Sequence, residues 1–349
     1  MPFNRKTACL TGFILIVISA CAWAGDGRAD SSRQGVQIQA GLDGEIYPVF
    51  ANVASLQGQN DRHFGVVTVT ISNPTGDELR QRVSVQVPGW SDQETQNVDL
   101  APGASQTLTF APSFLPRFYQ NHEIIAATAR VSIADMEGGS VLETTAPVRL
   151  RSSEDIYWGP NFKFAPFIAS WVTPHDSRVE SVLAKAKQYT ADHRLPGYED
   201  WKNAEDQERE TYREANAIYI ALQGMGLSYV KSSMTLGGHQ DYSERVRMPQ
   251  VSLDQSSMNC IDAVVMYASL FENLGMDAKV IIVPGHAFVG VRVARGSSKF
   301  LLIDAALTGR VPFATAVSSA ENGMARHAPA STIEIMIPEA RSAGIYPMP

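Results

Sequence analysis

Residues 37–152 carry short runs in which apolar and polar side chains alternate, with turn-forming residues between them. The run 82–87 alternates strictly, and the run 65–72 ends at the turn sequence NPTG at 73–76. Alternation with a period of two is typical of strands that bury one face. About seven such runs, without a competing helical period, predict an all-β sandwich domain over residues 37–154.

Helical periods replace this alternation after about residue 155. Asp176 and Ser177 can cap a helix that continues to about His193, and residues 205–223 form a second helix with one apolar face that ends at Gly224. Short apolar strands follow near the C-terminus. We therefore expect an α+β domain over residues 155–349, with a helix packed on an antiparallel sheet.

A predicted helix over residues 261–274 carries the most informative position. It is apolar nearly all round and closes at Gly275, so it should run through a core. Asn259 is a good N-cap, and Asp262 three residues later resembles the second half of a capping box. Cys260 then occupies the first helical position, where free backbone N–H groups and the helix dipole stabilise a thiolate.

Two further polar residues stand at the ends of predicted strands. Three short apolar runs follow the helix, at 278–283, 287–293 and 300–303. His286 opens the second run and Asp304 ends the third, and a turn between these runs makes them antiparallel neighbours. A thiol nucleophile needs a base beside it and a group that orients the base. The order therefore predicts a catalytic triad of Cys260, His286 and Asp304.

Other interpretations of the same residues are open at this stage. Cys260 taken alone is most simply a buried, inert thiol, His286 a core histidine and Asp304 a turn former. The three residue types could also ligate a metal, but no closely spaced Cys or His pair supports a metal site. We expect no metal and no organic cofactor.

The residues around the triad resemble the motifs of the transglutaminase-like superfamily. The matching segments are NCID at 259–262, PGHAFVG at 284–290 and LID at 302–304. The run RVRMP at 245–249 and a separate closing run at 333–347 resemble one bacterial exported branch of that superfamily. The resemblance therefore covers about residues 175–349. It implies a papain-like core and acyl transfer from a peptide or amide carbonyl to Cys260, as in a protease, amidase or transglutaminase. The preceding sandwich resembles immunoglobulin-like modules of exported enzymes.

One position departs from that family pattern. Related sequences often carry a Gln just before the Arg-Val-Arg run that helps to hold the oxyanion, whereas this chain has Glu244. The backbone N–H of Cys260 is one expected oxyanion donor. Candidates for the second are Glu244 itself and the nearby Gln240, Gln250 and Gln255. The departure favours an alternative function, a catalytically silent module that binds a peptide for an envelope assembly.

The first 24 residues predict export. Arg5 and Lys6 precede an uncharged apolar run that ends at Ala24, as in a secretory signal peptide. Cleavage after Ala24 competes with a lipoprotein signal that ends before Cys21, and an uncleaved anchor is a third reading. We expect a periplasmic protein or an envelope-anchored lipoprotein attached through lipidated Cys21, with a polar linker at 25–36.

Composition narrows the classes of partner. With 29 basic and 36 acidic residues the net charge is −7, which argues against a polybasic nucleic-acid-binding protein. Three cysteines exclude a disulfide scaffold and a multi-thiolate cluster. We expect a peptide or protein substrate, an envelope protein as partner, and no nucleic acid. The polar run at 151–155 is expected to be an accessible domain boundary.

Overall fold

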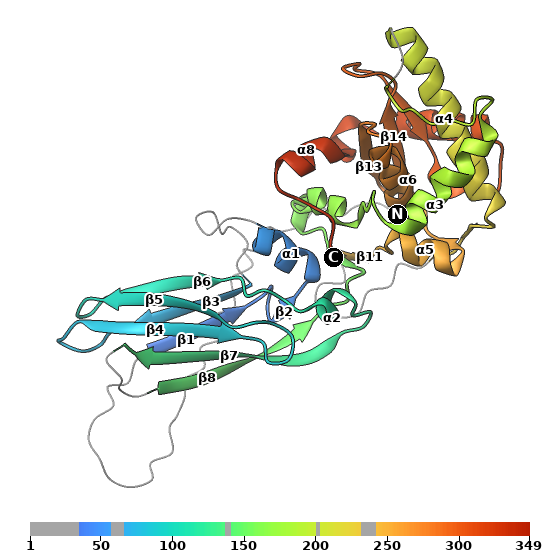
Figure 1. The fold of residues 1–349 in the computed structure, drawn as a ribbon. Coiled ribbons are helices and arrows are strands. Elements are labelled where there is room, and N and C mark those ends of the chain that lie inside the picture. The colour runs from blue at the N-terminus through green and yellow to red at the C-terminus, as the bar shows by residue number, and fades with distance from the viewer. Residues whose placement is uncertain (1–34, 57–65, 137–140, 200–202, 232–241) are drawn as a thin grey trace, which may run out of the picture. The chain divides into compact units, whose positions relative to one another are not determined.

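The computed structural model describes residues 35–349 except 57–65, 137–140, 200–202 and 232–241 (Figure 1). The chain is a mixed protein of helices and sheets, consistent with the α+β class. Its contacts divide it into two units. The first comprises residues up to 46, 58–118 and 125–151, and the second comprises 47–57, 119–124 and 152–349. The predicted signal peptide, with Cys21, lies outside the described residues.

The first unit contains two sheets. A three-stranded antiparallel sheet has the order β1 (Gly35–Ala40), β3 (Val67–Ser72) and β6 (Ser105–Phe110). A five-stranded sheet has the order β2 (Glu45–Ile46), β8 (Val141–Leu150), β7 (Ile125–Asp135), β4 (Leu79–Gln86) and β5 (Glu94–Leu100). Alternate residues such as Val67, Val69 and Ile71 are fully buried, so the predicted strand periodicity is confirmed. β1 begins at Gly35, inside the expected linker.

The expectation that residues 37–152 contain no helix is wrong at α1 (Pro48–Leu56). Pro48 is its first residue, where a proline costs no helical hydrogen bond. Val49 and Val53 are buried one helical turn apart, a spacing that a short apolar run does not distinguish from a strand. The helix belongs to the second unit, where the amide of Asn52 donates to the carbonyl oxygen of Tyr346 at 3.2 Å.

The second unit is built on one antiparallel sheet with the strand order β15-β14-β13-β16 (Figure 1). The strands are β13 (Ala278–Val283), β14 (His286–Arg292), β15 (Phe300–Ile303) and β16 (Ile333–Met336). The helices are α3 (Ser177–Ala186), α4 (Ala204–Gly224), α5 (Pro249–Gln255), α6 (Cys260–Asn273), α7 (Phe313–Ala325) and α8 (Ile337–Ser342). α6 packs against β13 and β14 and is buried from Ile261 to Phe271. The predicted core helix and its sheet are confirmed.

The charged helix predicted to reach His193 is shorter than expected. α3 ends at Ala186 and continues only as a 3-10 turn over Lys187–Tyr189. Thr190 is then extended, and its hydroxyl lies 2.9 Å from the carbonyl oxygen of Lys187 and 3.1 Å from that of Arg194. This side-chain bonding competes with the helical pattern and ends the helix.

The polar run at 151–155 is buried, so the expectation of an accessible boundary there is wrong. β9 (Asp155–Tyr157) pairs with β11 (Ser243–Arg245). The Glu154 carboxylate is held by His122 at 3.3 Å and by Arg245 at 2.6 Å. Polar residues can be buried here because their partners are present. Within the described ranges, no helix has the length and apolar character needed to cross a membrane.

Candidate active site

Cys260 is the first residue of α6, at a helix end that is fixed by its own side chains. The Asn259 side chain accepts a hydrogen bond from the Asp262 N–H at 2.8 Å, and the Asp262 carboxylate accepts one from the Asn259 N–H at 2.9 Å. The predicted capping box is therefore confirmed. Cys260 is half-buried and has a free thiol. Its sulfur thus sits at the positive end of a core helix and remains within reach of a substrate.

The Arg-Val-Arg run is tied to the same helix end. The Arg247 N–H and its guanidinium donate to the Asp262 carboxylate at 2.8 and 3.1 Å. Burial raises the pKa of Asp262, and the hydrogen bonds from Asn259 and Arg247 oppose that rise. The charge of Asp262 is thereby neutralised locally, and the segment between β11 and α5 is held beside Cys260.

His286 and Asp304 meet at adjacent strand ends, as the hairpin arrangement predicts. His286 is the first residue of β14, and Asp304 directly follows β15, whose Ile303 pairs with Val289. The Nε2 atom of His286 lies 2.9 Å from Oδ1 of Asp304. Because Nε2 is engaged by Asp304, Nδ1 is the ring nitrogen left for Cys260, whose side chain also raises the pKa of the imidazole.

These contacts set the protonation of the imidazole. The hydrogen bond to Asp304 and then that to Cys260 raise the pKa of His286 to about 9, against the opposing effect of burial. Since the pKa is raised, the ring holds its proton at neutral pH and loses it only as the pH rises through about 9. At neutral pH both ring nitrogens of His286 therefore carry a proton, one facing Asp304 and the other left for Cys260.

Asp304 is held by a second residue that the sequence did not indicate. The Ser319 hydroxyl, from α7, donates to the other carboxylate oxygen of Asp304 at 2.9 Å. The Asp304 N–H donates to the carbonyl oxygen of Ala316 on the same helix at 3.1 Å. Both carboxylate oxygens of Asp304 thus have partners, and its side chain is only 9% exposed. The carboxylate is positioned to orient the imidazole.

The candidate oxyanion donors predicted from the sequence lie in different surroundings. Gln240 lies outside the described residues. Gln250 borders a cavity that none of the triad residues borders, and Gln255 is exposed at the end of α5. The backbone N–H of Cys260 is at the first turn of α6, where no intrahelical partner exists for it. Glu244 lies in β11, and the Trp158 indole N–H donates to its Oε2 at 3.3 Å. Burial raises the pKa of Glu244 to about 7, the Trp158 hydrogen bond opposes this, and Asp262 adds to it.

Tyr229 is a site residue that sequence reasoning missed. It lies in β10 (Ser228–Tyr229), which pairs in parallel with β12 (Ser257–Met258) and sets Tyr229 beside Met258. Tyr229 is 40% exposed. Burial raises its pKa, as do the charges of Cys260, Asp262 and Glu244. The phenol therefore lies among these groups, although a two-residue strand gives no periodic signal that could have indicated it.

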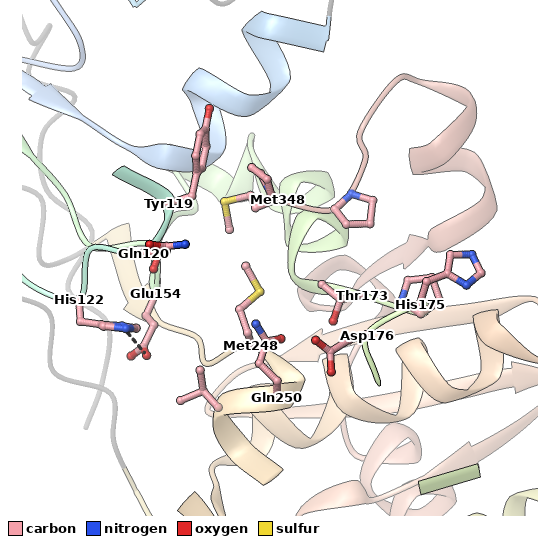
Figure 2. Close-up of a pocket in the computed structure, with 15 residues that line it drawn as sticks. Tyr119, Gln120, His122, Glu154, Thr173, His175, Asp176, Met248, Gln250 and Met348 are labelled. Atoms are coloured by element: carbon pink, nitrogen blue, oxygen red, sulfur yellow. Dashed lines mark ion pairs between the residues drawn. The ribbon is translucent and has the colours of Figure 1, made fainter. Parts of the chain in front are cut away.

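A separate cavity of about 470 Å³ lies elsewhere in the second unit (Figure 2). It is bordered by Tyr119, Thr173, Met248, Gln250 and Met348, with the His122–Glu154 ion pair at one side. None of the three triad residues borders it. Among the residues that the structure describes, no group of three metal-ligating side chains could hold a metal ion.

Comparison with known proteins does not assign this chain to a family. The sequence matches no protein-family model, and no curated protein is significantly similar to it.

Proposed function

We propose that this protein is a cysteine-dependent acyl-transfer enzyme that acts on a peptide or amide bond. The observation that carries the proposal is the 2.9 Å contact between His286 Nε2 and Asp304, combined with the effect on the same imidazole of Cys260, a cysteine at a helix N-terminus. Nucleophile, base and orienting carboxylate in one hydrogen-bonded chain are what thiol catalysis requires. We further propose a papain-like, transglutaminase-like second unit and an immunoglobulin-like first unit.

The proposed reaction has two halves. The Cys260 thiolate attacks the carbonyl carbon, forming the C–S bond and placing the negative charge on the carbonyl oxygen. The His286 imidazolium gives its proton to the leaving nitrogen as the C–N bond breaks, which leaves a thioester. Water or an amine then attacks the thioester and gives its proton to His286. The thiolate leaves, and the starting ion pair is restored.

The remaining groups of the site orient His286 and stabilise the charges that form during the reaction. Asp304 stabilises the imidazolium and keeps Nδ1 directed at the sulfur, and Ser319 holds Asp304 in place. The backbone N–H of Cys260 donates to the developing oxyanion. Every step uses groups of the chain and its substrate. A peptide or protein is the substrate that this reaction implies, in line with the sequence-based expectation.

We propose that the protein acts outside the cytoplasm, because residues 1–24 have the pattern of a secretory signal peptide. Cys21→Ser in the full chain tests the lipoprotein route. Loss of lipid labelling and of membrane retention is expected, and an unchanged soluble product would contradict lipidation. Recovery of the wild-type chain in the cytoplasm would contradict export altogether.

Thiol reactivity tests the proposed function without knowledge of the substrate. At pH 6 only about 0.3% of an ordinary thiol with a pKa near 8.5 is ionised. We expect iodoacetamide to modify Cys260 of the wild type at pH 6 at least about tenfold faster than Cys260 of His286→Ala, because the imidazolium sustains the thiolate. Mass-spectrometric mapping measures the rates, and His175→Ala, an exposed histidine, is the matched control. Equal rates in all three proteins would show an ordinary thiol.

Glu244 is our candidate for the second oxyanion donor. A carboxyl group whose pKa is about 7 is largely neutral below that pH, and a neutral carboxyl has an O–H that can donate. Its Oε2 accepts a hydrogen bond from the Trp158 indole N–H, and it lies within electrostatic range of Tyr229 and of Asp262, a residue in the first turn of α6. A neutral Glu244 can therefore do what an amide side chain does at the same position.

The raised pKa of Glu244 predicts how the activity changes with pH. Since the pKa of Glu244 is raised, the donor is present below about pH 7 and is lost as the pH rises through that value. We expect wild-type kcat/KM for an activated ester to fall above pH 7 and Glu244→Gln to lack that fall, because an amide donates at every pH. Glu244→Ala should lose about 10- to 100-fold at low pH. Superimposable profiles for the wild type and Glu244→Gln would exclude this role.

A further inference from the structure

The imidazole ring of His286 needs more than its hydrogen bond to Asp304 to stay in one plane. The torsion about the Cβ–Cγ bond of a histidine is broad, so the backbone does not fix the ring. The side chain is 31% exposed, and the single contact between Nε2 and Asp304 leaves the ring able to pivot about it. Because the proposed reaction needs Nδ1 directed at Cys260, a second contact on the ring bears on catalysis.

Phe288 supplies this second contact. It lies two residues after His286 in β14, so both side chains project from the same face of the sheet. The two rings lie edge to face, with centroids 4.8 Å apart and planes at 87° to each other. Aromatic pairs attract each other in this geometry. Phe288 is only 3% exposed, so it forms a buried wall beside a partly exposed imidazole.

The ring of Phe288 is itself held in place by α7. A Cβ added at Gly323 would lie 2.5 Å from Cζ at the far end of the ring and 3.2 and 3.3 Å from its two Cε atoms. Glycine is a poor residue for the interior of a helix, and the contact with Phe288 accounts for its presence in α7. Phe288 also belongs to a buried cluster with Ile281, Val283 and Ala320, so it does not move aside without disturbing the core.

The same side of α7 holds Asp304. Ser319 lies about one helical turn before Gly323, and its hydroxyl donates to the Asp304 carboxylate at 2.9 Å. The carbonyl oxygen of Ala316, about one turn earlier still, accepts the Asp304 N–H at 3.1 Å. One side of this helix therefore supports the carboxylate directly and the imidazole through Phe288.

We propose that Phe288, seated against Gly323, is a positioning residue that holds the His286 ring in the plane that acyl transfer requires. The inference rests on the proposed function and adds to it a residue that acts through His286. A leucine at position 288 would fill part of the same space, but it has no rigid ring to lie against the imidazole. His286 would then gain freedom to pivot, and its hydrogen bond to Asp304 would loosen.

Phe288→Leu and Gly323→Ala disturb the contact from its two ends. Each should lower kcat for hydrolysis of a 4-nitrophenyl ester by about tenfold or more with little change in KM, because a small displacement of a reacting group is costly. The pKa of His286, followed by NMR of its ring C–H protons, should fall from about 9 toward 6.5 in both, since the bond to Asp304 is the largest cause of the raised value.

Two further variants make the test specific. The combined variant should lose no more activity than Phe288→Leu alone, because Gly323→Ala then has no ring to displace. Phe271→Leu is the matched control. It removes a fully buried ring near the other end of α6 from Cys260, and it should keep the wild-type kcat and the wild-type pKa of His286.

The outcomes separate the two proposals. If Phe288→Leu matches Phe271→Leu in kcat and in the pKa of His286, Phe288 only fills the core, the inference is overturned and the proposed function stands. Losses that add up in the combined variant overturn the link to Gly323. If no ester acylates Cys260 of the wild type, the proposed function fails, and the inference about catalysis fails with it. Folding is checked by circular dichroism, and Gly323→Ala, which keeps the ring, decides if Phe288→Leu does not fold.

Discussion

Cys260→Ala is expected to abolish acyl transfer, lowering the rate of 4-nitrophenyl ester hydrolysis by about 10,000-fold or more. The reason is that Cys260, the free cysteine of the described residues, is the nucleophile that forms the covalent intermediate in the proposed reaction. The fold should be retained, with a change in the free energy of unfolding within about 1 kcal/mol, because the residue is half-buried at a helix start and alanine is a good helix former. Nitrophenolate release measures the rate.

Cys260→Ser is the matched variant, because it keeps the shape of the side chain and removes only the thiol. It should lose most of the activity as well, since an alcohol is not ionised by this imidazolium. Ester hydrolysis at the wild-type rate in both variants would show that the triad does no chemistry. It would then favour the alternative of a catalytically silent module, for which peptide binding should be the same in all three proteins.

Asp304→Asn is expected to lower turnover by about 100- to 1,000-fold while the fold survives. The corresponding Asp-to-Asn change in a Ser-His-Asp enzyme lowers turnover by about 10,000-fold. We expect a smaller loss here because a thiolate–imidazolium pair depends less on the carboxylate than a neutral serine does. An amide that donates its N–H to Nε2 of His286 favours the tautomer with a proton on Nδ1, which cannot take a proton from the thiol. The Ser319 hydroxyl can still bond to the amide oxygen, so the loop should stay in place.

Asp304→Asn should also change how the free energy of unfolding depends on pH. Without the carboxylate, the pKa of His286 should fall from about 9 toward its usual value of 6.5. A raised histidine pKa contributes stability that is full below about pH 6.5 and is lost as the pH rises through 9. The difference in unfolding free energy between the wild type and Asp304→Asn should therefore shrink between those pH values, as urea titrations can measure. Asp99→Asn, in the first unit and exposed beside Arg80, is the control. A pH-independent difference would contradict the His286–Asp304 coupling.

Local and adjacent features of the site could be predicted from the sequence. The capping box needs only four consecutive residues, so the position of Cys260 at the start of α6 follows from residues 259–262. His286 opens β14 and Asp304 follows β15, and these strands are consecutive in the chain, so their antiparallel pairing could be expected. The alternation in the first unit is likewise a property of single strands, such as β3 and β4.

What escaped prediction depends on contacts between distant segments. Ser319 meets Asp304 only because α7 packs against β15, and Tyr229 is placed by a two-residue parallel pairing. The raised pKa of Glu244 arises from burial, which no single-residue rule gives. The polar run at 151–155 looked exposed because its partners, such as Arg245, lie far along the chain. Helix α1 was missed because its apolar run is too short to show a period.

Trapping the acyl-enzyme tests the central claim most directly. The wild type is mixed with a 4-nitrophenyl ester, quenched in acid, digested, and mapped for the acyl group by mass spectrometry. The account predicts a thioester on Cys260 that forms with a burst of nitrophenolate, disappears when hydroxylamine is added as acceptor, and forms far more slowly in His286→Ala. An acyl group found only on other side chains, or on Cys260 at the same rate with and without His286, would contradict it.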